Sequence, residues 1–149
     1  MDIKTVYDRQ FKTIYMTAMI YLRNTYDAED AVHDVFVKYM KKRVKFKDIE
    51  HERAWFIRTA INRCKDILKS SERKTVDIAD FIDIIEAPDD EKALLSSILE
   101  LPEKYREVIY AYYYEGYSVK EISSLFDINE STIRTRLSVG REKLREGEI

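Results

Sequence analysis

The side chains best suited to contact another molecule lie near the end of the chain. Ser131, Thr132, Arg134 and Arg136 are close together in the sequence. Hydroxyl and guanidinium groups donate hydrogen bonds to base edges and phosphates in the major groove of DNA, and an arginine that binds guanine through two hydrogen bonds contributes roughly 1–3 kcal/mol of discrimination. In a helix the two arginines would point to different sides, so that one could reach a base and the other a phosphate. The alternatives are solvated arginines, and hydroxyl groups that only cap a helix.

The flanking sequence predicts a helix-turn-helix that would present these residues. Ser118 and Glu121 have the S-x-x-E spacing of a capping box, which satisfies free N–H groups at a helix start. Residues 127–129 interrupt the apolar pattern, and Asn129 is a good N-cap for the next helix. The second helix has an apolar stripe of Ile133, Leu137, Gly140 and Leu144. This pattern is typical of DNA-binding proteins, although a plain helical hairpin with a solvated basic face would also satisfy it.

Composition favours a helical protein without disulfide bonds. The chain has 149 residues, of which 36% are charged and 45% apolar, with only three Gly and two Pro. The single cysteine, Cys64, excludes an internal disulfide framework and a Cys-rich zinc site. No apolar run approaches the roughly 18 residues of a membrane span, and the N-terminus lacks the apolar core of a signal peptide. We therefore expect a cytoplasmic protein.

Helical periodicity predicts an all-α protein of two small domains. Apolar residues recur with this period over residues 7–22, 28–40 and 54–68, with Asp27 as the expected cap of the second helix and residues 45–52 as a loop. A second group of helices follows from residue 91, including one that starts at Pro102 and stops at Gly116. Residues 71–97 hold 3 basic and 8 acidic side chains, a net charge of −5. We expect residues 71–90 to form an acidic linker, with room for one short helical turn, that becomes ordered against a partner.

Three stretches in this order resemble an extracytoplasmic-function (ECF) sigma factor. They are AEDAVHDVFVKYMKK (28–42), RAWFIRTAINRCKDILK (53–69) and LPEKYREVIYAYYYEGYSVKEISSLFDINESTIRTRLSVGREKLRE (101–146). The first two are similar to sigma region 2 and the third to region 4. The resemblance implies a region 2 domain of three to four helices at residues 1–70, an acidic linker at 71–90, and a four-helix region 4 domain with the helix-turn-helix at 91–149.

The resemblance also implies a function without catalysis or a cofactor. Such a protein binds core RNA polymerase and directs promoter recognition, melting and transcription initiation, and an anti-sigma factor controls it and can hold it at the membrane. Region 2 binds the clamp of the β′ subunit and the −10 element; region 4 binds the flap of the β subunit and the −35 element. Two departures affect these contacts. His33 stands where the family usually has Gln, and residues 138–140 lack a basic residue that the family often carries.

Three sets of binding residues follow from the matched motifs. The candidates for the −35 element are Ser131, Thr132, Arg134, Thr135, Arg136 and Arg141. The candidates for the −10 element are Trp55, Arg58, Asn62, Arg63, Asp66 and Lys69. The candidates for core polymerase are Asp30, His33, Asp34 and Lys38.

Some of these candidates have a structural alternative. Asp66 could accept from a cytosine amino group or pair with Arg63 or Arg58, and core packing is the favoured interpretation of Trp55. The loop at residues 45–52 could receive a flipped base, because aromatic side chains stack on unpaired bases.

Two other functions fit parts of the sequence. Asp30-x-x-His33 and Asp48-x-x-His51 faintly resemble the Glu-x-x-His pairs of di-iron helical bundles, but such a site needs two further Glu residues and longer carboxylate arms. We therefore expect no metal site and no catalytic residue. The other alternative is a sigma-like helix-turn-helix activator that does not replace the primary sigma factor.

Overall fold

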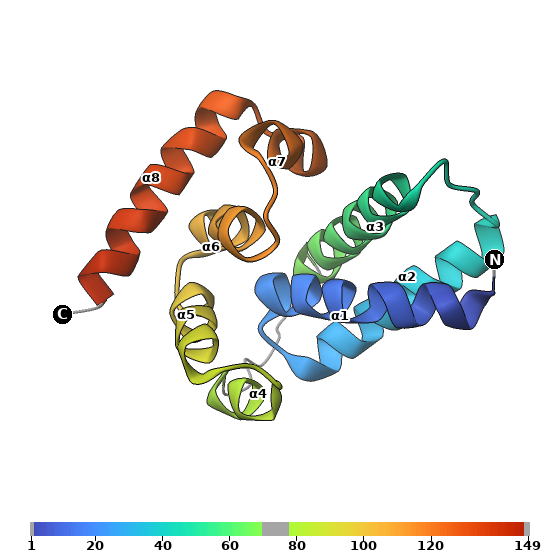
Figure 1. Ribbon diagram of the computed structural model, residues 1–149, viewed down its shortest axis with the longest axis horizontal. Coiled ribbons are helices and arrows are strands. Elements are labelled where there is room, and N and C mark those ends of the chain that lie inside the picture. The colour runs from blue at the N-terminus through green and yellow to red at the C-terminus, as the bar shows by residue number, and fades with distance from the viewer. Residues whose placement is uncertain (1, 70–77, 148–149) are drawn as a thin grey trace. The chain divides into compact units, whose positions relative to one another are not determined.

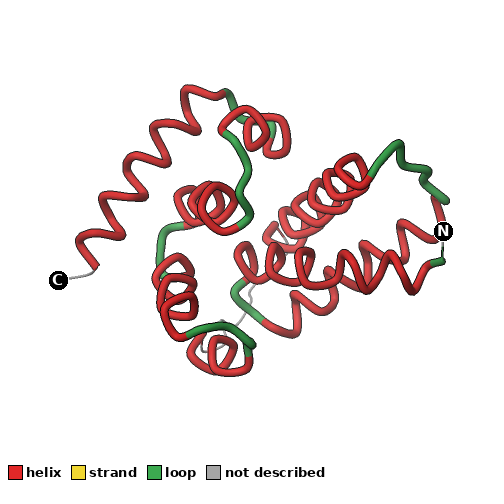
Figure 2. Tube along the Cα trace, viewed as in Figure 1, coloured by secondary structure: helices red, strands yellow, loops and turns green. Residues whose placement is uncertain are grey.

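The computed structural model describes residues 2–69 and 78–147, and within these ranges the chain forms helices and no strand (Figure 2). The all-α prediction is therefore confirmed. The chain divides into two compact units, residues 1–76 and 77–149. Figure 1 labels the helices of both units in chain order.

Unit 1 contains three long helices, each of which packs against the other two: α1 (Ile3–Leu22), α2 (Thr25–Lys42) and α3 (Ile49–Lys69). Asn24 caps α2, because its side chain accepts from the backbone N–H groups of Tyr26 at 2.9 Å and Asp27 at 3.1 Å. The prediction that Asp27 caps this helix is wrong, because the cap lies one turn earlier. Asp27 instead lies in the first turn of α2, where a negative charge favours the positive end of the helix dipole.

The core of unit 1 combines small and aromatic side chains. Ala28, Ala31 and Ala60 are fully buried, and small residues at such positions let helices approach closely. Beside them Phe36 lies 5.1 Å from Phe56 and 4.8 Å from Tyr7, measured between ring centroids. These rings join all three helices into one apolar core.

The loop between α2 and α3 is shorter than predicted. Helix α3 begins at Ile49 rather than near residue 54, because the Asp48 carboxylate accepts from the backbone N–H of His51 at 2.7 Å and so caps the helix. The prediction of a loop over residues 45–52 is therefore wrong for its second half. It failed because the first turn of α3 is exposed apart from Glu52, and its only apolar residue, Ile49, is exposed too, so periodicity does not reveal the turn.

Unit 2 contains α4 (Ile78–Ile84), α5 (Asp89–Leu99), α6 (Glu103–Ile109), a π-helical turn η1 (Tyr110–Tyr114), α7 (Val119–Phe126) and α8 (Glu130–Gly147). Helix α4 lies in the stretch that we predicted to be a linker. Its Phe81 and Ile82 are buried and it packs against α5, so residues 78–84 belong to a folded unit. The residues of the predicted linker that precede α4, 71–77, lie outside the described residues.

The helix predicted to start at Pro102 continues into the π-turn. The backbone N–H of Glu115 donates to the carbonyl of Tyr110 at 3.1 Å, five residues earlier, and Gly116 ends the element with a φ of 77°. The predicted stop at Gly116 is confirmed, since this left-handed conformation favours glycine.

Candidate nucleic-acid interface

The helix-turn-helix is built by local capping. The Ser118 hydroxyl accepts from the backbone N–H of Glu121 at 3.1 Å, and the Glu121 carboxylate accepts from the backbone N–H of Ser118 at 3.0 Å, so the predicted capping box is confirmed. Asp127 then turns the chain with a φ of 56°. Asn129 caps α8 as predicted, since its side chain accepts from the backbone N–H of Thr132 at 2.8 Å. Helices α7 and α8 therefore have fixed ends and a tight connection.

The packing of α8 against its neighbours determines which of its faces is exposed to a binding partner. Ile133, Leu137 and Gly140 are buried, and α8 packs against α6 and α7. A Cβ atom at Gly140 would lie 2.6 Å from Cγ1 of Ile109, so that glycine permits the close approach of α6 and α8. The opposite face is exposed and polar, and it includes Ser131, Arg134, Thr135 and Ser138.

The −35 candidates fall into two groups on this helix. Ser131, Arg134 and Thr135 lie on the exposed face, where the Arg134 side chain is 63% exposed with Glu130 3.9 Å away. Thr132, Arg136 and Arg141 lie on the flanks and are partly buried.

The two flanking arginines contact other parts of unit 2. Arg136 lies 3.8 Å from the carboxylate of Glu107 in α6, and their side chains are 27% and 9% exposed. Arg141 donates to the hydroxyl of Tyr113 in the π-turn at 3.0 Å. The sequence did not indicate that Glu107 and Tyr113 would hold these arginines, because both partners are distant in the chain.

A second polar face lies on α3 in unit 1. Arg58, Asn62, Asp66 and Lys69 are exposed at helical spacing, so the structure brings most of the −10 candidates together. Trp55 and Arg63 are only partly exposed.

Trp55 sits in an aromatic cluster, in agreement with the favoured packing interpretation. Its ring centroid lies 5.0 Å from that of Phe56, 5.9 Å from Phe46 and 6.1 Å from Tyr39. The cluster holds the loop after α2 against α3.

The polymerase candidates lie on α2, close to the α3 face. Asp30, His33 and Lys38 are exposed, and Asp34 is partly exposed. One oxygen of Asp34 accepts from Nε of Arg63 at 2.7 Å, while the other lies 3.9 Å from Nδ1 of His33. The arginine that we considered as a partner for Asp66 therefore pairs with Asp34 across the α2–α3 boundary.

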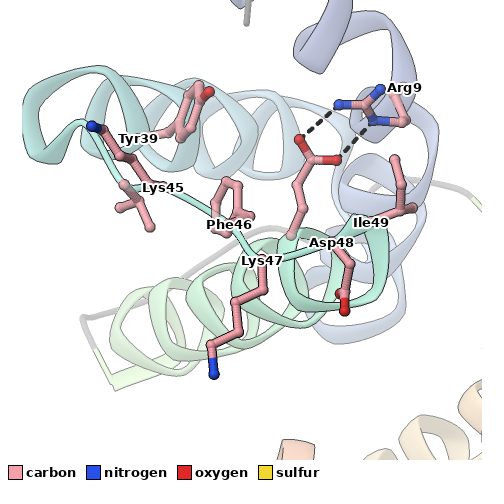
Figure 3. A pocket seen from close by; sticks show the side chains of 9 residues that line it. Arg9, Tyr39, Lys45, Phe46, Lys47, Asp48 and Ile49 are labelled. Atoms are coloured by element: carbon pink, nitrogen blue, oxygen red, sulfur yellow. Dashed lines mark hydrogen bonds and ion pairs between the residues drawn. The ribbon is translucent and has the colours of Figure 1, made fainter.

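A cavity of about 480 Å³ opens under the loop between α2 and α3 (Figure 3). Its lining includes Tyr39, Phe46, Lys45 and Lys47, which offer aromatic faces and positive charges. The loop that we considered as a place for a flipped base therefore borders a cavity, and that role stays a prediction.

One wall of the cavity is a partly buried ion pair, which the sequence did not indicate. Arg9 donates to the Glu52 carboxylate at 2.7 and 2.8 Å (Figure 3). Gln10 donates to the same carboxylate at 3.1 Å. The hydrogen bond to Glu52 raises the pKa of the Arg9 guanidinium, so the charge is held firmly. These bonds tie α1 to the start of α3 and so support the cavity wall.

The second aspartate–histidine pair, Asp48 and His51, has structural partners. Asp48 caps α3, and Nδ1 of His51 accepts from the backbone N–H of Lys47 at 3.1 Å. Among residues 2–69 and 78–147, no three His, Cys, Asp or Glu side chains are close enough to hold a metal ion. In the same ranges no helix has the length and hydropathy needed to cross a bilayer.

Comparisons with known proteins cover both units. Residues 6–74 match the family described as Sigma-70 region 2, and residues 91–144 match Sigma-70, region 4. The ECF RNA polymerase sigma factor SigM of Bacillus subtilis (strain 168) is 24% identical over 157 residues, spanning 97% of this chain and 94% of the relative. SigW from the same organism, also an ECF RNA polymerase sigma factor, is 27% identical over 164 residues, spanning 97% and 86%.

Two solved structures share the fold. The sigma factor RpoE, solved in complex with the anti-sigma factor NepR from Bartonella quintana, superposes with a TM-score of 0.71 at 21% identity, over 97% of this chain and 95% of that one. CnrH, solved with the cytosolic domain of CnrY, superposes with a TM-score of 0.66 at 21% identity, over 97% and 85%. With sigma regions 2 and 4 in this order, and with relatives that align along nearly its whole length, the chain belongs to the ECF class of RNA polymerase sigma factors.

Proposed function

We propose that the two units divide promoter recognition between them. Unit 1 binds the β′ clamp and the −10 element, and unit 2 binds the β flap and the −35 element through residues 91–149. The observation that carries this proposal is that each unit presents one helix with an exposed polar and basic face, α3 in unit 1 and α8 in unit 2. The protein acts as a dissociable cytoplasmic subunit of polymerase and catalyses no reaction itself.

Helix α8 reads the −35 element with its exposed face. Arg134 has the freedom to reach a base edge, and Ser131 and Thr135 lie beside it on the same side. Thr132, Arg136 and Arg141 flank this face, where side chains meet the phosphates that border the groove. The contacts of Arg136 and Arg141 within unit 2 orient these two guanidinium groups before DNA binds.

Helix α3 and the adjacent cavity bind the −10 element. Arg58, Asn62, Asp66 and Lys69 contact the strand, with Arg63 and Trp55 at the edges of the face. The cavity receives one unpaired base, which stacks on Phe46 while Lys45 and Lys47 attract the neighbouring phosphates. Stacking of a base on an aromatic side chain is worth about 1–3 kcal/mol.

Helix α2 binds core polymerase through Asp30, His33, Asp34 and Lys38. Changing both Asp30 and Asp34 to Lys should weaken binding to core polymerase and leave the helix content unchanged, because both side chains are at the surface. Glu29→Lys is the matched control, since it reverses a charge on the same helix outside the proposed contact. Wild-type affinity of the double variant in a core-binding titration would show that this face is merely solvated.

An anti-sigma factor controls this protein by covering these surfaces. The support is that RpoE and CnrH, which share the fold, were each solved with a regulatory partner, the anti-sigma factor NepR and the cytosolic domain of CnrY. A membrane-bound partner of this kind would also hold the protein at the membrane until a signal releases it.

The test is a DNA titration with and without core polymerase. The chain has a net charge of −2, and residues 128–145 hold only 5 basic and 2 acidic side chains. Phosphate contacts dominate non-specific affinity, so the free protein should bind promoter DNA poorly at about 0.15 M salt. Core polymerase should fix the spacing of the two units and raise the effective concentration of the second contact.

Transcription provides the decisive readout. With core polymerase and a randomised promoter library, this protein should select one pair of elements and initiate run-off transcription. Sequence-specific nanomolar binding by the free protein, without transcription on core polymerase alone, would contradict the proposal and favour the stand-alone activator.

A further inference from the structure

One ion pair in unit 1 connects the α2 face proposed to bind polymerase with the α3 face proposed to bind DNA. Asp34 lies on the polymerase face of α2, and Arg63 lies beside the DNA face of α3. The Nε–H of Arg63 donates to Oδ2 of Asp34 at 2.7 Å, and both side chains are 42% exposed. The pair is therefore short, yet open to a competing partner on either side.

While Asp34 and Arg63 bind each other, Asp34 cannot fully bind polymerase and Arg63 cannot fully bind DNA. A guanidinium that pairs with a carboxylate contributes little net charge to a phosphate, and its Nε–H points at Asp34 rather than at DNA. In the same way, Asp34 offers less negative charge to a cation of polymerase while Arg63 occupies one of its oxygens. His33, whose Nδ1 lies 3.9 Å from the other oxygen, is the remaining charged or titratable neighbour that the described contacts place at Asp34.

We propose that the Asp34–Arg63 pair is an autoinhibitory contact that couples polymerase binding to DNA binding. In the free protein Asp34 withholds Arg63 from DNA. When a cationic side chain of core polymerase binds Asp34, Arg63 is released and contacts a phosphate near the −10 element. This inference rests on the functions proposed above for the α2 and α3 faces.

Thermodynamic linkage makes the coupling reciprocal. If binding of polymerase at Asp34 raises the affinity for DNA at Arg63, then binding of DNA at Arg63 raises the affinity for polymerase at Asp34 by the same factor. Removing either side chain ends the competition for the other, so we expect the two variants to have effects of similar size. Ion pairs this exposed change equilibria about 1.4- to 5-fold. One additional phosphate contact on single-stranded DNA steepens the dependence of log affinity on log salt by about 0.7.

The first experiment measures binding of the full-length free protein to labelled single-stranded DNA of randomised sequence. Asp34→Asn should tighten binding about 1.4- to 5-fold and steepen the salt dependence by about 0.7. Glu29→Gln removes one charge from the same helix without touching Arg63, and it is the control for general electrostatic attraction. In an Arg63→Gln background, Asp34→Asn should change DNA affinity no more than Glu29→Gln does, because the Asp34–Arg63 contact is then already absent.

The second experiment measures binding of core polymerase in the absence of DNA. Arg63→Gln should tighten binding by a similar factor, because Asp34 is then free for polymerase. Lys65→Gln is the matched control, since Lys65 is an exposed cation on the same helix outside the proposed contacts.

Each outcome decides a separate point. If Arg63→Gln leaves the DNA affinity of the Asp34→Asn variant unchanged, the proposed DNA contact of Arg63 is wrong and the coupling is wrong with it. If Arg63→Gln weakens DNA binding but Asp34→Asn does no more than Glu29→Gln, the proposed function stands and the autoinhibitory contact is refuted. Equal effects of Arg63→Gln and Lys65→Gln on polymerase binding would refute the reciprocal coupling.

Discussion

Replacing Gly140 with Ala should destabilise unit 2 although alanine is the better helix former. The added Cβ would lie 2.6 Å from Cγ1 and 2.9 Å from Cδ1 of Ile109, about 1 Å inside ordinary carbon–carbon contact. Ile109 is fully buried, so its side chain has no open space to enter. Overpacking of this kind costs about 1–3 kcal/mol, and the gain in helix propensity is about 1 kcal/mol. The net expected loss is therefore up to about 2 kcal/mol.

A double-mutant cycle isolates this clash. Ile109→Ala removes both carbon atoms that the new Cβ would meet, so in that background Gly140→Ala should become neutral or stabilising. Gly147→Ala is the control, because it is also in α8 and its added Cβ would have no other atom within 4 Å. Urea titration followed by amide signals of α6 and α8 measures the stability of unit 2. Fluorescence of Trp55, the single tryptophan, reports on unit 1 and should not change.

Two results would refute this reasoning. If Gly140→Ala is as stable as the wild type, α6 and α8 do not approach as closely as described. If the destabilisation persists unchanged in the Ile109→Ala background, its cause is something other than contact with that side chain.

Three further predictions concern the binding residues and a partly buried tyrosine. Arg134→Ala should lower transcription initiation without changing the stability of unit 2. Arg136→Ala should lower initiation and also destabilise unit 2, because it removes the ion pair with Glu107. Initiation assays and urea titrations distinguish these two effects. Phe46→Ala should weaken binding of single-stranded −10 DNA by about 1–3 kcal/mol in the holoenzyme while duplex −35 binding is unchanged. Burial, with a hydrogen bond to a glutamate, raises the pKa of Tyr114 to about 12. Because the folded state then holds its proton more tightly than the unfolded state, unit 2 should lose stability as pH rises from about 10 towards 12, and Tyr114→Phe should reduce this loss in pH-dependent unfolding curves.

Local signals in the sequence predicted the helix-turn-helix well. Ser118, Glu121 and Asn129 act on backbone groups within three residues, so their spacing alone indicates where helices begin. Gly116 stops a helix through its own backbone conformation. The apolar stripe of α8 was also predictable, because burial on one side of a helix leaves a periodic pattern.

Competing local signals explain the errors at two helix starts. Asn24 and Asp27 are both good caps, and the sequence does not say which one accepts the N–H groups. Asp48 lies before a turn without an apolar period, so the first turn of α3 was assigned to the loop. Helix α4 was expected as no more than one short turn of a linker, because its acidic residues outweighed the few apolar ones that pack against α5.

Contacts between distant residues were beyond sequence reasoning. Arg9 and Glu52 are 43 residues apart, and Asp34 and Arg63 are 29 apart. Nothing in the spacing of such charges selects one partner over another, because the packing of three helices decides which side chains meet. For the same reason, Asp66 could not be distinguished from Asp34 as the partner of Arg63.

The helix ends bear on how this protein can evolve. Arg23, Arg43 and Asp127 close three helices in the left-handed conformation, with φ values of 52°, 49° and 56°. A side chain with a Cβ pays roughly 1–2 kcal/mol for that conformation and glycine does not, although glycine gains entropy in the unfolded chain. At Arg43 and Asp127, whose side chains are exposed, glycine should therefore give a more stable protein. The stability gained in this way would allow destabilising substitutions to accumulate on the exposed face of α8. That face could then evolve to recognise new promoter sequences.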